Sequence, residues 1–97
     1  MGITVTNNEN EKRYQATVDG HLVKIDYITT KNKVYLTHTE VPPALEGKGL
    51  GKAIVEQALE DIKQQGKELV PLCPFVAAFL KRNPDWAELL APGFNVS

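Results

Sequence analysis

Cysteine is almost absent from this sequence of 97 residues, because Cys73 is the only one. A single cysteine excludes an internal disulfide and any metal site built from several thiolates, so we expect no resident metal. No apolar run approaches the roughly 20 residues that a membrane-spanning helix needs. The first residues also lack the basic and apolar segments of a secretory leader. We therefore expect a cytoplasmic protein that does not contact a membrane.

An excess of either charge is also absent. The chain has 11 Lys and Arg against 12 Asp and Glu, a net charge of −1, so nothing indicates a nucleic-acid surface. Hydrophobic residues make up 42% and charged residues 24%, which is ordinary for a globular protein. At this length we expect residues 1–97 to form a single compact domain, present as a monomer or a weak dimer.

Alternating apolar and polar residues predict an antiparallel meander in the first part of the chain. We expect strands over 3–6, 13–18, 21–29 and 33–40, separated by short polar turns. Asp19-Gly20 fits a type I′ hairpin turn, which needs positive φ at both central residues. Within the strand over 33–40, the period of two places Val34, Leu36 and His38 on one face.

The apolar period then changes to that of a helix. Ile54, Ala58 and Ile62 recur four residues apart, and Gly66 suits the left-handed cap that ends a helix. A short apolar strand over 68–72 follows. The right-handed crossover rule predicts that this strand runs parallel to the strand over 33–40.

Prolines punctuate the rest of the chain. A second helix is expected to start at Cys73-Pro74 and to stop at Asn83-Pro84. The fold class is therefore a mixed α/β (α+β) sheet, with an antiparallel meander, a parallel β-α-β unit and a C-terminal helix. Pro71 cannot donate a ladder hydrogen bond, which leaves two interpretations. Either its strand is an ordinary edge strand, or it splays from its neighbour and opens a cleft at the carboxyl ends of the strands.

Three glycines at alternate positions, Gly47, Gly49 and Gly51, stand where the first helix begins. The first N–H groups of a helix lack intrahelical partners and carry partial positive charge. Glycine leaves room for a phosphate to approach these groups. The loop thus predicts an anion-binding site, and the alternative is that the glycines only form a tight strand-to-helix turn.

Two common phosphate-binding motifs do not fit this loop. A Walker loop ends in Gly-Lys-Ser or Gly-Lys-Thr, and no hydroxyl follows here. A dinucleotide fingerprint needs other glycine offsets and an acidic residue after the next strand, where Cys73 lies. Glu46-Gly47-Lys48-Gly49-Leu50-Gly51 resembles instead the acetyl-CoA pyrophosphate loop of the GNAT (GCN5-related N-acetyltransferase) superfamily, Gln/Arg-x-x-Gly-x-Gly/Ala. Glu46 departs from that pattern, and a carboxylate beside a diphosphate should weaken binding.

Two flanking segments extend the resemblance to short, single-domain GNAT proteins. They are His38-Thr39-Glu40-Val41-Pro42 and Val70-Pro71-Leu72-Cys73-Pro74-Phe75-Val76. The resemblance implies a GNAT acyl-CoA N-acyltransferase fold that holds acetyl-CoA between splayed parallel strands. It implies pantetheine contacts from 39–41, diphosphate contacts from backbone N–H groups of 47–52, and packing of the second helix on the cofactor. The implied cofactor-binding residues are Thr39, Glu40, Val41, Gly47, Lys48, Gly49, Leu50, Gly51, Lys52, Pro74, Phe75 and Phe79.

Three side chains are candidates for catalysis. His38 changes charge near neutral pH and is a candidate base, although it could equally be a half-buried structural histidine. Glu40 is the other candidate base, or else a solvated carboxylate. Cys73 at a helix start could be an activated nucleophile or a proton donor to the leaving thiolate, and if it is activated we expect its thiol to be reachable from the cleft. Its alternative role is a small buried hydrophobe.

The resemblance therefore implies acetyl-CoA-dependent N-acetyl transfer to an unidentified amine, either a small molecule or a protein. The short turns at Asp19-Gly20 and Lys31-Asn32 leave no room for the helices that build much of the acceptor site in larger GNAT enzymes. The acceptor is therefore small, or supplies its own wall, or meets a second subunit. The alternative function is a non-catalytic CoA-binding or protein-interaction module on the same fold.

Overall fold

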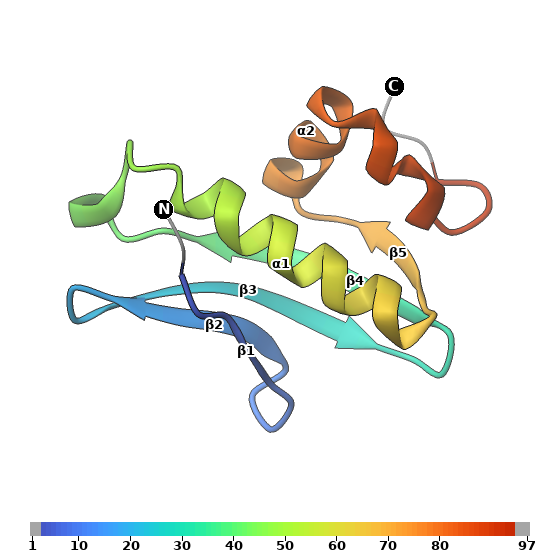
Figure 1. Ribbon diagram of the computed structural model, residues 1–97. Helices are drawn as coiled ribbons and strands as arrows, with labels where there is room; N and C mark the ends of the chain where they lie inside the picture. Colours follow the sequence, from blue (N-terminus) through green and yellow to red (C-terminus); the bar gives the residue numbers. More distant parts are fainter. Residues whose placement is uncertain (1–2, 95–97) are drawn as a thin grey trace.

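The computed structural model describes residues 3–94 as a five-stranded sheet with its long helix lying across one face (Figure 1). The first four strands are antiparallel and the fifth is parallel to the fourth, which confirms the mixed sheet. In chain order and in sheet order, the strands are β1 Thr6–Asn8, β2 Arg13–Val18, β3 His21–Thr29, β4 Lys33–Glu40 and β5 Glu68–Pro71. The helices are α1 Leu50–Gln65 and α2 Pro74–Arg82, with 3₁₀ turns η1 Pro43–Leu45 and η2 Pro84–Leu89.

The predicted bounds of β2, β3 and β4 are confirmed, and that of β1 is wrong. The expected strand over 3–6 is replaced by Thr6–Asn8, so the turn falls after Asn8 instead of over 7–10. The polar side chains that suggested a turn have partners in the sheet. Asn7 lies opposite Tyr14 in the ladder, and its Oδ1 accepts a hydrogen bond of 2.6 Å from the hydroxyl of Tyr27.

A β-bulge interrupts β4 near its end. Asp26 of β3 lies opposite His38, and Tyr27 lies opposite Leu36, so Thr37 is an extra residue without a partner. One extra residue reverses the alternation of the side chains that follow. The prediction that His38 shares a face with Val34 and Leu36 is therefore wrong, and Thr39 takes the core side in its place. The hydroxyl of Thr37 donates to the carbonyl of Asp26 at 3.2 Å.

Helix α1 covers one face of the sheet with its apolar stripe, as the period of four predicts. Ile54, Ala58 and Ile62 are fully buried against the sheet. Gly66 caps the helix in the left-handed conformation, φ 72°, and its N–H bonds to the carbonyls of Ile62 and Lys63. No helix in residues 3–94 is long and apolar enough to cross a membrane. The core therefore lies between this single helical layer and the sheet.

Pairing between β4 and β5 ends early. The ladder runs from Lys33 opposite Glu68 to Leu36 opposite Pro71, while β4 continues to Glu40. One more bond follows, from the N–H of Cys73 to the carbonyl of Leu36 at 2.9 Å. Both interpretations of Pro71 thus hold, because β5 is an edge strand and the two strands also part at their carboxyl ends.

Tyr14 ties β2 to α1, since its hydroxyl donates to Asp61 Oδ2 at 2.7 Å. Burial, and then the Asp61 carboxylate, raise the pKa of Tyr14 above its ordinary value of 10.0. Above pH ~10 the unfolded chain therefore loses this proton while the folded protein keeps it, and stability falls as pH rises.

Tyr14→Phe should remove the loss of stability that the folded protein shows as pH rises above ~10. The free energy of unfolding, measured by urea titration above pH ~10, should fall less steeply in the variant, by up to ~1.4 kcal/mol per pH unit. At neutral pH the variant should lose about 1 kcal/mol, the usual net contribution of one hydrogen bond. The raised pKa of Tyr27 leaves a residual slope in both proteins. Equal slopes would contradict the role given to Tyr14.

Candidate functional site

The glycine loop turns the chain from η1 into α1. Gly47 and Gly49 have φ of 82° and 73°, in the left-handed region that favours glycine. Gly49 is the N-cap of α1 and offers no side chain to the first N–H groups of the helix, which are left for a ligand. A Cβ at Gly47 or Gly49 would meet nothing within 4 Å, so these two glycines serve the turn and leave open space above it.

Gly51 has a different role from the one expected. A Cβ on Gly51 would stand 2.6 Å from Cζ of Phe75, so this glycine is covered by an aromatic ring instead of being bare for a phosphate. The close approach lets Phe75 of α2 pack on the first turn of α1. The ring is nevertheless 45% exposed, so its other side remains available to a ligand.

A cavity of about 480 Å³, here called the loop pocket, lies above the glycine loop at the carboxyl end of β4. Its wall combines the end of a strand, the start of a helix and one aromatic ring. The cleft predicted beside the glycine loop is therefore present. The lining residues are Thr39, Val41, Leu45, Glu46, Gly47, Gly49, Leu50, Gly51, Lys52 and Phe75.

Cys73 lies at the bottom of the gap between β4 and β5. It is the N-cap residue of α2, as predicted, and its Sγ is 3.3 Å from Oγ1 of Thr39, a pair in which either atom could donate. The side chain is only 4% exposed, which agrees with the alternative of a small buried residue and not with an activated thiol open to the cleft. Thr39 lines the loop pocket and thus stands between Cys73 and any ligand there.

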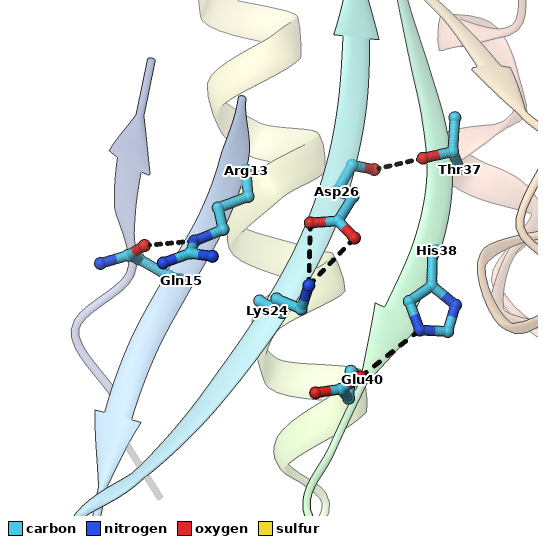
Figure 2. A network of polar contacts seen from close by, with 7 residues as sticks. All are labelled: Arg13, Gln15, Lys24, Asp26, Thr37, His38 and Glu40. Carbon is cyan, nitrogen blue, oxygen red and sulfur yellow. Dashed lines mark hydrogen bonds and ion pairs between the residues drawn. The ribbon is translucent and has the colours of Figure 1, made fainter. Parts of the chain in front are cut away.

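His38 and Glu40 lie on the opposite face of the sheet, away from α1 (Figure 2). Their side chains are 60% and 57% exposed, and Nε2 of His38 is 3.7 Å from Oε1 of Glu40. His38 is therefore not a half-buried structural histidine. Beside them, Lys24 bonds to Asp26 at 3.1 Å, so charged groups continue across this face.

The structure thus gathers most of the expected cofactor-binding residues in one place and separates the candidate bases from Cys73. Phe79, 7% exposed, lines a second cavity next to the loop pocket. Lys48 points elsewhere, since its Nζ is 3.9 Å from Oδ2 of Asp19. Glu40 and Pro74 are not among the residues that line either cavity.

Sequence reasoning did not identify Leu45, Ala78, Arg82 and Asn83 as lining residues. The helical spacing of Phe75, Ala78, Phe79 and Arg82 was the available signal.

Comparison with known proteins gives one family and one fold. The family model described as GCN5-related N-acetyl-transferase matches residues 13–89. Protein NATD1 of Bos taurus is 29% identical over 100 residues, covering 95% of this chain and 88% of that protein. Protein NATD1 of Gallus gallus is 29% identical over 90 residues, covering 87% and 81%. The NMR structure of a GCN5-like protein from Staphylococcus aureus has the same fold, with a TM-score of 0.72 at 20% identity, covering 96% of this chain and 91% of that one.

The burial of Cys73 predicts its reactivity. In the folded protein, iodoacetamide should alkylate this thiol much more slowly than in the same protein unfolded in guanidinium, because the reagent must reach a buried sulfur. Mass spectrometry of timed samples gives both rates, and Cys73 is the only thiol that can react. Equal rates in the two states would show that the thiol is open to solvent.

Proposed function

Because the chain belongs to the GCN5-related N-acetyltransferase family, we propose that it is an N-acetyltransferase that uses acetyl-CoA to acetylate an amine. The observation that carries the proposal is the loop pocket. There the free N–H groups of a helix start, the end of β4 and the gap between β4 and β5 meet in one cavity. The pocket provides a place for an anion and for an extended arm that leads toward the gap.

The residues of the loop pocket fit the chemical parts of acetyl-CoA. The turn at Gly47 and Gly49 presents backbone N–H groups at the positive end of the α1 dipole, which suits a diphosphate. Thr39 and Val41 line the pocket at the end of β4, where backbone groups of the strand suit hydrogen bonds with the amides of a pantetheine arm. Glu46 lines the same cavity and is the one group that opposes an anion, while Lys52 supplies a compensating positive charge.

Acetyl transfer to an amine requires a neutral nucleophile and a protonated leaving group. When bound, acetyl-CoA supplies the acetyl group as a thioester. His38 is the proposed base that takes the proton of the incoming ammonium, and Glu40 at 3.7 Å stabilises the charged imidazole. On the pocket side, the Cys73 thiol is the proposed source of the proton for the leaving thiolate, and the Thr39 hydroxyl, 3.3 Å from it, passes this proton on by accepting one and donating its own.

The proposed base, His38, and the proposed proton donor, Cys73 with Thr39, act from opposite faces of β4. Beyond Leu36 the strand has no partner in β5, so a thioester at this open edge is accessible from both faces. An amine that approaches over the uncovered face meets His38 and Glu40 first. The acceptor and the cofactor would thus approach β4 from opposite faces and meet at its open edge.

A non-catalytic CoA-binding module is the second candidate. The carboxylate of Glu46 in the loop pocket and the burial of Cys73 favour it. The release of free CoA from acetyl-CoA in the presence of a panel of amines separates the two functions. Binding of CoA without any amine-dependent release would favour the module.

CoA should stabilise the folded protein. At 100 times its Kd it adds ~2.7 kcal/mol to the free energy of unfolding, which raises Tm by about 10 °C or more in a domain of this size. Gly49→Val should remove most of this shift, because a branched residue at φ 73° distorts the turn. Gly93→Val, also at positive φ but remote from the pocket, is the matched control. A Tm independent of CoA would contradict cofactor binding.

His38→Gln should lower kcat on the order of 10²-fold without changing the affinity for CoA, because the variant cannot accept a proton. Glu40→Gln should have a smaller effect. Lys24→Gln, on the same face, controls for general loss of charge. Steady-state kinetics and CoA titrations together separate binding from chemistry. A kcat equal to that of the parent would remove His38 from the mechanism.

Cys73→Ala and Cys73→Ser distinguish the possible roles of the thiol. A serine hydroxyl can still donate a hydrogen bond, but it is a poor nucleophile at neutral pH. We expect Cys73→Ser to retain more activity than Cys73→Ala, as a donor role predicts for a buried thiol paired with Thr39. Equal large losses, with a trapped acetyl-protein in mass spectra, would indicate covalent catalysis instead.

A further inference from the structure

Leu72 is a large apolar side chain that the fold leaves in solvent. It follows directly after β5 and is 56% exposed, the same fraction as Ile28 of β3. It belongs neither to the core nor to the residues that line the loop pocket or the second cavity. Exposed apolar residues are common on protein surfaces, so the position of Leu72 has to show whether it has a role.

The backbone holds Leu72 at the point where β4 and β5 part. Its own N–H bonds to the carbonyl of Val70 at 3.1 Å, which makes a tight turn at Pro71. The N–H of the next residue, Cys73, bonds to the carbonyl of Leu36, the last residue of β4 with a partner in β5. Leu72 therefore lies at the closed end of the gap, beside the open edge of β4.

The side chain of Leu72 lies on the side from which the amine is proposed to approach. Cys73 meets Thr39 on the pocket side, and its backbone is extended, with φ −76° and ψ 126°. Successive side chains of an extended chain point to opposite sides, so Leu72 is directed away from the pocket. His38 and Glu40, 60% and 57% exposed, lie on that same side (Figure 2).

The open edge of β4 thus has charged groups on one strand and an apolar group at the end of the other. The carboxylate of Glu40 attracts an ammonium, and His38 beside it is the proposed base. Leu72 offers apolar surface, which is favourable for a carbon chain to cover. An acceptor that uses both features has a positive end and an apolar part next to it.

Building on the proposed function, we propose that Leu72 is a specificity-determining residue that binds the carbon chain of the acceptor. The acceptor class is a primary amine at the end of an unbranched apolar stem. The stem covers Leu72 while the amine reaches His38 and Glu40. A free alkylamine and the side chain of a lysine share this chemistry.

The test measures KM and kcat for n-alkylamines from ethylamine to hexylamine, by CoA release at saturating acetyl-CoA. These amines are nearly equally basic, so the series changes only the apolar area. The KM of the parent should fall about twofold for each added methylene, less than the roughly fourfold of full burial, because Leu72 covers one side of the stem. The kcat should stay nearly constant, since the amine meets the same base.

Three variants separate the contact of Leu72 from a general effect. Leu72→Ser should reduce the dependence of KM on stem length to about twofold or less over the whole series. Leu72→Met keeps the apolar area and should keep the dependence. Ile28→Ser is the matched control, because Ile28 is equally exposed but lies opposite Tyr35, before the gap. It should behave like the parent.

A lysine derivative distinguishes the two sources of such an amine. Nα-acetyl-lysine N-methylamide has the same stem as butylamine and adds peptide groups at its far end. A KM below that of butylamine indicates a lysine in a peptide, and a KM above it indicates a free amine. In both cases Leu72→Ser must raise the KM.

Other outcomes would overturn the assignment. A KM independent of stem length in the parent would mean that no residue binds the stem. Equal losses in Leu72→Ser and Ile28→Ser would indicate a general effect of apolar surface. A lower kcat at unchanged KM in Leu72→Ser would make Leu72 a structural support of the site. Absence of CoA release by the parent with every amine is a different result, because it would contradict the proposed function itself. Circular dichroism confirms that each variant is folded.

Discussion

The separation of β4 from β5 determines the rest of the site. Pro71 has no N–H to donate, and the ladder ends at Leu36 opposite Pro71. The chain then turns, and the N–H of Cys73 makes the last bond to β4 at the carbonyl of Leu36. This bond fixes the start of α2 beside the open edge of β4. The loop pocket, the Thr39–Cys73 pair and the position of Phe75 all depend on it.

The bulge at Thr37 divides the functional groups between two faces. Without the extra residue, His38 would point into the core and Thr39 to solvent. With it, Thr39 reaches Cys73, and His38 stands beside Glu40 on the uncovered face (Figure 2). A single inserted residue thus places Thr39 on the side of the loop pocket and the charged pair of His38 and Glu40 on the other side of the same strand. The proposed base and the proposed donors can act on one thioester because the strand edge between them is open.

In residues 3–94, α1 covers one face of the sheet, and the side chains of His38 and Glu40 are exposed on the other (Figures 1 and 2). Helices α1 and α2 both contribute buried side chains to one core, and they border the two adjoining cavities. Each of these helices therefore both packs in the core and lines a cavity. Helix α2 packs Leu80 into the core and lines the loop pocket with Phe75, and its last residue, Arg82, lines the second cavity.

Local patterns in the sequence determined the elements, and contacts between distant segments determined the site. The period of two predicted β2 to β4, and the period of four predicted α1. Gly66 and Pro74 predicted where helices end and begin. These predictions are correct because each signal acts within a few residues. The glycine loop and its flanking segments also indicated the family. The bulge at Thr37 had no local signal, so the face of His38 was predicted wrongly. The burial of Cys73, the ring of Phe75 over Gly51 and the place of Arg82 were decided only when α2 packed against α1 and β4.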